Sequence, residues 1–257
     1  MFAGFNLFLE PKDKLQLRRY NNYKIYDSCK NDVRGSIDDY WSPDGTLEGT
    51  EIEQDWFPDI IDAHVFISHS HEDEIWAKKL ASWLYQKYSI KSFVDSMVWG
   101  YANDLLKQID DEYSESQYYN NKGIYDYNKR NQSTAHVHMI LQGALAKMID
   151  KCECLIFVNT PNSISTYDIN DDSKTASPWI YNELLMAKML RRKIPERYQL
   201  LSESVEDKIS KLKINYQAYL DNLEFLELED IEKAGRKFTH GDAEDVLDQL
   251  YKDKGLM

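Results

Sequence analysis

The chain has few cysteines and no long apolar run. Only three cysteines, Cys29, Cys152 and Cys154, occur in 257 residues, too few and too unevenly spaced for the disulfide framework of a secreted domain. No apolar stretch approaches the roughly 18 to 20 residues needed to cross a bilayer. The first residues, MFAGFNLFLEPKDK, lack the basic start and long apolar core of a signal peptide. These absences predict a soluble, cytoplasmic protein with no membrane partner.

Positive charge is also scarce. The chain has 31 Lys and Arg against 44 Asp and Glu, a net charge of −13. Affinity for phosphate backbones comes chiefly from Lys and Arg, so no nucleic-acid partner is expected. No GxGxxG follows a predicted strand and no GxxxxGK[ST] occurs, so neither a Rossmann nor a P-loop site is supported. A pocket for a single nucleotide stays open.

From residue 63 onwards, short apolar runs alternate with amphipathic stretches. The pattern predicts strands at 64–68, 90–96, 154–159 and 223–228, and helices at 73–84, 103–113, 138–149, 178–193, 203–213 and 242–252. Strands that alternate with helices favour an α/β fold with a parallel sheet covered on both faces. Ligands of such sheets bind beyond the carboxyl ends of the strands, an edge that here carries residues 68–73, 95–100 and 159–179.

The remaining segments carry no recognisable chemistry. Residues 1–62 are polar and Tyr-rich and predict an N-terminal extension packed on a main domain of residues 63–257. Inside that domain, about 101–135 reads as an inserted segment, in which the Tyr-rich stretch 114–134 shows no period and predicts a long loop. Residues 195–257 are predicted as a C-terminal helical part.

The spacing HxHxD makes His69, His71 and Asp73 a candidate metal site. It matches the opening of the metallo-β-lactamase signature HxHxDH, and zinc requires imidazole and carboxylate ligands that converge from a turn. The next residue is Glu74 instead of histidine, however, and no later histidines are well placed as further ligands. No metal or other cofactor is therefore expected, and histidines that line a loop are the preferred interpretation.

Trp179 and Glu183 are the second candidate pair. They lie one turn apart on a predicted helix, so the indole and the carboxylate share a face near its start. Ser177 suits the N-cap and Pro178 the first helical position. If this helix start faces the sheet edge, both side chains line one pocket. A surface glutamate beside a core tryptophan is the alternative, and spacing alone favours it.

Four segments in order resemble the Toll/interleukin-receptor (TIR) domain: HVFISHSHED, IKSFVDSMVWG, CLIFVNTPNSIS and SPWIYNEL. The family motifs are a strand ending in (F/I)SxxxxD, a strand ending in FxD with a glycine soon after, and a strand–loop–SxWxxxE unit. The resemblance covers residues 63–195 and implies a flavodoxin-like sheet of about five parallel strands with helices on both faces. The chain departs from the family in its inserted segment and in the lack of a clear fourth strand after Lys193.

TIR domains of bacterial and plant immune systems commonly cleave NAD, and the resemblance makes Glu183 the catalytic residue. It also implies that the loop from Ser68 to Asp73 borders the nucleotide, and that the loop with Asp95, Ser96, Trp99 and Gly100 gates the pocket or meets a neighbouring subunit. The substrate-binding residues implied in this way are Ser68, Ser70, His71, Asp95, Trp99, Ser177 and Trp179.

The expected function is therefore NAD cleavage in bacterial antiphage immunity, similar to the signal-producing component of Thoeris systems. Nicotinamide leaves NAD as a neutral molecule, so a carboxylate that stabilises the oxocarbenium-like ribose is sufficient, much as in glycosidases. The implied partners are NAD as substrate, further copies of the chain through TIR surfaces, and a separate effector that senses the product. The product stays open between ADP-ribose, a cyclic isomer and a conjugate. A non-enzymatic TIR adaptor is the main alternative and a metal-dependent hydrolase a weaker one.

Overall fold

A computed structural model describes residues 1–21, 36–57, 63–115, 125–164, 174–195, 197, 223–238 and 243–257, with the backbone alone for 97–100. The chain divides into two compact units. The first comprises Met1–Asn22, Asp62–Val94 and Ile149–Met257, and the second comprises Tyr23–Ile61 and Asp95–Met148. One boundary of these units falls between residues 61 and 62, one residue from the predicted boundary, and residues 1–22 belong to the same unit as residues 62–94.

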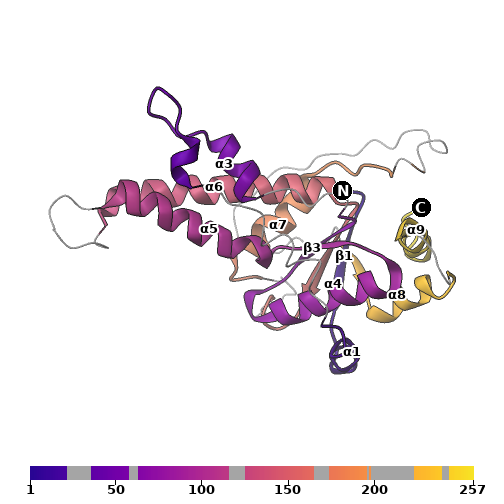
Figure 1. Ribbon diagram of the computed structural model, residues 1–257. Helices are drawn as coiled ribbons and strands as arrows, with labels where there is room; N and C mark the ends of the chain where they lie inside the picture. The colour runs from indigo at the N-terminus through magenta and orange to yellow at the C-terminus, as the bar shows by residue number, and fades with distance from the viewer. Residues whose placement is uncertain are drawn as a thin grey trace. The chain divides into compact units, whose positions relative to one another are not determined.

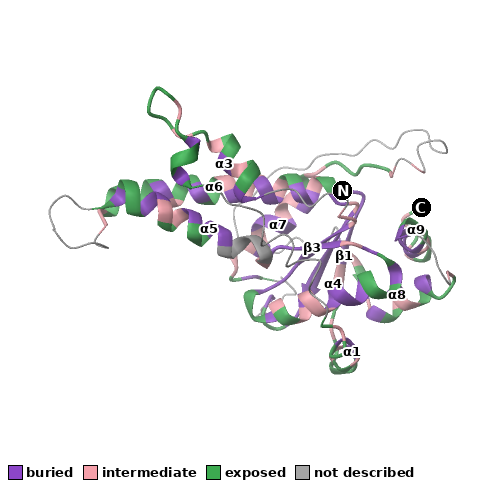
Figure 2. Cartoon of the chain, viewed as in Figure 1, coloured by how far each residue is buried: buried purple, intermediate pink, exposed green. Residues whose placement is uncertain are grey.

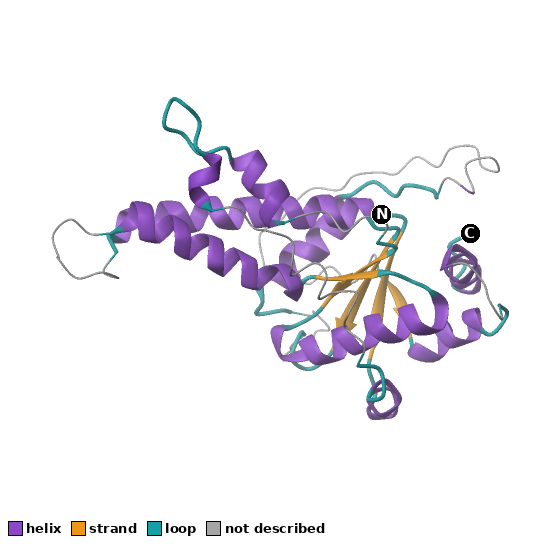
Figure 3. Cartoon of the chain, in the orientation of Figure 1, coloured by secondary structure: helices purple, strands orange, loops and turns teal. Residues whose placement is uncertain are grey.

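A five-stranded sheet forms the centre of the first unit, and all its pairings are parallel (Figure 1). Its order is β3-β2-β4-β1-β5, with β1 (Ala3–Phe8), β2 (Val65–Ser68), β3 (Ser92–Val94), β4 (Cys154–Asn159) and β5 (Glu224–Leu226). Helices flank the sheet (Figure 3). The predicted α/β class is confirmed, and the parallel sheet is consistent with a flavodoxin-like fold.

Strand β1 is the main departure from the prediction, because it lies inside the sheet and not in an N-terminal extension. It pairs with β4 from Ala3↔Cys154 to Phe8↔Asn159, and with β5 on its other side. The neighbour of β4 that the resemblance places after Lys193 is thus supplied by the N-terminus. The six residues AGFNLF include only one polar side chain, Asn6, but the run is short, and its pairing with β4 and β5 is what makes it a central strand.

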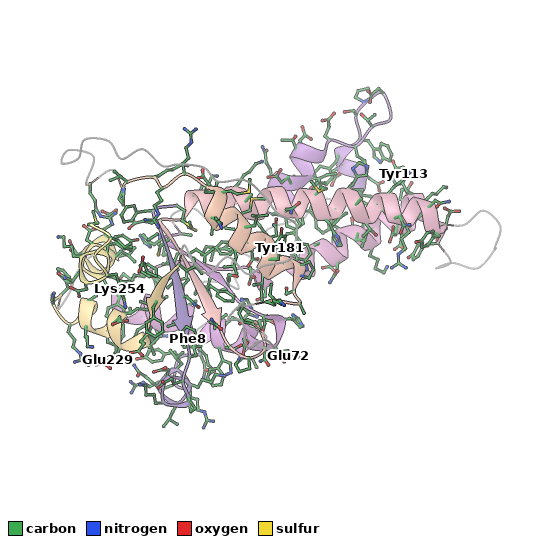
Figure 4. All side chains as sticks on the ribbon, turned by 180° about the vertical axis from the view of Figure 1, so that it is seen from behind. Phe8, Glu72, Tyr113, Tyr181, Glu229 and Lys254 are labelled. Carbon is green, nitrogen blue, oxygen red and sulfur yellow. The ribbon has the colours of Figure 1, made fainter. Side chains whose placement is uncertain are left out.

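Helices cover both faces of this sheet. On one face lies α4 (Glu74–Tyr88), and α7 (Pro178–Met189) lies on the other (Figures 1 and 4). Strands β2, β3 and β4 are buried throughout (Figure 2). The remaining helical elements of the unit are α1 (Pro11–Leu17), the short η2 (His71–Asp73), α8 (Leu228–Gly235) and α9 (Ala243–Asp253). Tyr251 of α9 is fully buried, and its ring stacks on Phe5 of β1 with 6.1 Å between centroids.

The predicted elements agree with these bounds in part. The strand at 154–159 is confirmed residue for residue, and the helices expected at 73–84, 178–193 and 242–252 are present with shifted ends. The strand expected at 223–228 ends at Leu226 because Leu228 opens α8, a helix that the sequence pattern does not predict. The helix expected at 203–213 lies outside the described residues.

The second unit is helical. It contains η1 (Ile37–Tyr40), α3 (Gly49–Trp56), α5 (Ser96–Ile109), the π-helix η3 (Asp110–Ser114) and most of α6 (Tyr127–Lys151). None of the helices in the described part of the chain is long and apolar enough to cross a membrane.

Two predictions for this unit are wrong. The loop expected over Ser96–Gly100 is the first part of α5, and residues 127–134 of the expected Tyr-rich loop are the start of α6. Buried Asp110 accepts hydrogen bonds from the hydroxyls of Ser114 and Ser133 and pairs with Arg130, which fastens this end of α6. Polar contacts of this kind leave no apolar period in the sequence.

Candidate functional site

The carboxyl edge of the sheet holds the residues that the sequence singles out. From β2 the chain passes to β3 on one side of the sheet, whereas β4 lies on the other side of β2. Connections diverge at such a switch point, and open α/β sheets bind their ligands there. Phe8, at the end of β1, and Glu72, after β2, mark this edge (Figure 4).

Ser68 and Glu183 meet at this switch point. Ser68 is the last residue of β2, and its hydroxyl donates a hydrogen bond of 2.5 Å to Oε2 of Glu183 on α7. Both residues have no exposed surface. An ionised carboxylate is costly to bury unless it is hydrogen-bonded, and a hydroxyl donor at this distance is typical of a charge-assisted bond. The structure therefore brings the predicted catalytic residue together with one predicted substrate-binding residue.

The start of α7 forms as the sequence predicts. Ser177 is the N-cap and its hydroxyl accepts a hydrogen bond of 3.3 Å from the backbone N–H of Ile180, while Pro178 occupies the first helical position. Ile180, Leu184 and Ala187 form the buried stripe of the helix, and Glu183 is buried with them. Trp179, one turn before Glu183, is only half-buried. A carboxylate beside an apolar stripe is the sequence signal that sets Glu183 apart.

The candidate metal motif HxHxD does not form a ligand cluster. His69 is fully buried whereas His71 is exposed, and the carboxylate of Asp73 is hydrogen-bonded to other residues. Burial lowers the pKa of His69, an effect that the nearby carboxylates of Glu183 and Glu74 oppose. Within the described residues, no group of three or more His, Cys, Asp or Glu side chains is arranged to hold a metal ion.

Asp73 instead joins two connections of the sheet. Its carboxylate accepts hydrogen bonds from the hydroxyl of Ser70 at 2.8 Å, from the hydroxyl of Thr160, and from Nδ2 of Asn162 at 3.3 Å. Ser70, predicted to bind substrate, thus bonds within this network. Thr160 and Asn162 are missed by the sequence reasoning, although polar residues directly after a buried strand are the signal that marks them.

The other predicted residues are not part of this cluster. Asp95 directly follows β3 and belongs to the second unit; it is buried, and its carboxylate accepts a hydrogen bond of 2.7 Å from the backbone N–H of Ser96 in the same unit. The side chain of Trp99 lies outside the described residues. Cys152 and Cys154 are buried, and burial raises the pKa of the Cys154 thiol.

A surface depression of about 440 Å³ lies elsewhere, between α1 and α8, and contains no predicted site residue. It is lined by Lys12, Leu15, Gln16, Arg19 and Glu232. The chemistry that the sequence predicts is concentrated at Glu183, so the depression is not assigned to the candidate site.

Comparisons of the chain with protein-family models, with curated proteins and with solved structures gave no match. The function is therefore argued from the site and from the sequence motifs alone.

Proposed function

We propose that this chain cleaves the bond between nicotinamide and ribose in NAD, with the carboxylate of Glu183 as the catalytic group. The observation that carries the proposal is the buried hydrogen bond between Ser68 and Glu183 at the switch point between β2 and β4. Open α/β sheets bind ligands at this place, and a fixed carboxylate shielded from water is suited to stabilise a developing ribosyl cation. The choice of NAD as the substrate rests on the likeness of four segments to TIR motifs.

The proposed step needs little beyond one carboxylate. The bond between C1′ of the ribose and the nicotinamide nitrogen breaks, and its electron pair leaves with nicotinamide, which becomes neutral. Glu183 stabilises the positive charge on the ribose, and Ser68 holds the carboxylate in one orientation. Water or another nucleophile then attacks C1′, which yields ADP-ribose, a cyclic isomer or a conjugate.

The burial of Glu183 adds a requirement to this mechanism. A side chain with no exposed surface cannot touch a substrate, so the residues that cover it have to move before NAD reaches the carboxylate. Such steps commonly limit turnover. We therefore propose a chain with low resting activity. From the likeness to TIR motifs we further propose that it assembles with further copies in the cytoplasm and that its product signals to a separate effector in antiphage immunity.

The test is NAD turnover by the purified chain, followed as released nicotinamide by chromatography and mass spectrometry. Glu183→Gln keeps the size of the side chain and removes its charge, so kcat is expected to fall by about 100-fold or more. Glu229→Gln, on the exposed side of α8, is the matched control and keeps full turnover. Equal turnover in Glu183→Gln and the unchanged chain would contradict the catalytic assignment.

One observation favours a second function, a TIR-type adaptor without enzymatic activity. Complete burial of Glu183 is also what a structural residue shows. In that case the unchanged chain releases no nicotinamide at millimolar NAD, even when concentrated, and Glu183→Gln lowers only the thermal stability. The pair of measurements separates the two functions.

A further inference from the structure

One side chain joins the connections that leave β2 and β4, and the first of these begins after Ser68, the hydrogen-bond partner of Glu183. Asp73 lies in the connection that leaves β2, five residues after Ser68, and its hydrogen-bond partners Thr160 and Asn162 lie in the connection that leaves β4. These are the two strands on either side of the switch point. Asp73 is 1% exposed, so these hydrogen bonds form inside the protein.

The side chain of Asp73 makes this contact instead of capping helix α4. It occupies the N-cap of α4, where an aspartate normally accepts a hydrogen bond from a backbone N–H of the first turn, yet its side chain makes no such bond. Its acceptor atoms are used across the sheet edge instead. The positive end of the α4 dipole still favours the charge at this position.

The partner segment after β4 is a rigid turn. The backbone N–H of Thr160 donates to the hydroxyl of Ser163 at 2.8 Å, and that hydroxyl in turn donates to the carbonyl of Thr160 at 2.9 Å. The hydroxyl of Thr160 also accepts from the backbone N–H of Asn162 at 3.2 Å. Because the turn is held by its own side chains, fixing Thr160 against Asp73 fixes the whole turn.

We propose that Asp73 is a positioning residue that sets the spacing between the exits of β2 and β4 and thereby the placement of Glu183 relative to its substrate; this inference rests on the proposed NAD cleavage. Charge-assisted hydrogen bonds to a buried carboxylate are among the stronger contacts in proteins. A catalytic group displaced by about 1 Å loses on the order of 100-fold in rate. Asp73 acts through the two connections and does not itself touch the reacting atoms.

Two variants of Thr160 test the proposal, one that removes its hydroxyl and one that keeps it. Thr160→Val has the same shape but cannot donate to Asp73, whereas Thr160→Ser keeps the donor. We expect Thr160→Val to lower kcat for NAD by about tenfold or more, with KM within about twofold, and Thr160→Ser to recover most of that kcat. Ser82→Ala, which removes a buried hydroxyl of α4 bonded to Gln86, is the matched control and changes neither constant.

Two measurements keep the outcome decisive. The melting temperatures are compared first, because a purely structural role lowers stability without changing kcat of the folded enzyme. Full kcat in Thr160→Val, or equal losses in Thr160→Val and Thr160→Ser, overturns the proposal. If the unchanged chain does not cleave NAD, the proposed function fails by itself. The hydrogen bond between Asp73 and Thr160 is then tested by hydrogen exchange of the backbone amides at residues 69–73 and 160–164. If the bond exists, exchange is faster in Thr160→Val and unchanged in Thr160→Ser; if it does not, exchange is unchanged in both variants.

Discussion

Replacing Phe5 by alanine tests whether the N-terminal residues belong to the sheet. Phe5 is fully buried in β1, pairs with Ile156 and Glu224 on the flanking strands, and lies under the ring of Tyr251. A buried phenylalanine truncated to alanine costs about 3 to 5 kcal/mol. Because a folded domain is stable by only about 5 to 15 kcal/mol, this one change removes a large part of the total.

The assay is urea unfolding followed by far-ultraviolet circular dichroism. With a denaturant dependence of about 3 kcal/mol per molar urea, the upper end for single domains, the midpoint of the transition that reports the sheet falls by roughly 1 to 2 M. Leu15→Ala on α1, at a residue that is 66% exposed, is the control and leaves the free energy of unfolding within about 0.5 kcal/mol of the unchanged chain. A Phe5→Ala chain as stable as this control would mean that residues 1–10 are a dispensable extension.

Two further substitutions test packing and electrostatics. Gly235→Ala, at the end of α8, places a methyl group against the ring of Tyr88 and is expected to cost about 1 to 3 kcal/mol. Gly143→Ala in α6 meets its nearest atom, Oε2 of Glu53, at 3.8 Å and is expected to gain about 0.5 to 1 kcal/mol. Thermal unfolding of both variants tests this, and a neutral Gly235→Ala would refute the contact. Burial lowers the pKa of His69 in the folded chain, so below about pH 6.5 its imidazole binds a proton more readily in the unfolded chain than in the folded one. Stability is therefore full above that pH and falls as the pH drops towards the folded pKa. His69→Gln removes this loss in urea titrations between about pH 6.5 and 5, exposed His136→Gln retains it, and the same slope in both variants would contradict the assignment.

Much of the fold follows from local pattern. Strand β4 consists of six consecutive buried residues followed by a polar residue, a pattern that is typical of a central strand in a parallel sheet. Helix α7 begins where Ser177 and Pro178 predict, because capping and the fixed φ of proline act within a few residues. The early part of α6 escapes prediction since its contacts are polar and reach back to Asp110. Helix α8 has a local capping box of Glu227 and Asp230, but it is short and begins inside the stretch predicted as a strand.

The site is partly readable in the same way. Glu183 stands out because a charged residue next to an apolar helical stripe needs a partner, and its spacing from Trp179 places it near the helix start. The identity of the partner is not readable, since Ser68 lies 115 residues earlier in the chain. The histidines of HSHED illustrate the opposite case: spacing suggests zinc ligands, but the backbone turns His69 inward and His71 outward.

The sequence by itself determined an acidic α/β chain with strands at residues 64–68 and 154–159 and a capped helix that carries Glu183, because hydrophobic period and capping are properties of neighbouring residues. Only the tertiary structure decided that residues 3–8 lie between β4 and β5. It also decided that Ser68 bonds Glu183 and that Asp73 bridges to Thr160. Strand pairing and buried hydrogen bonds depend on which distant surfaces exclude water together, and no short stretch of sequence contains that information.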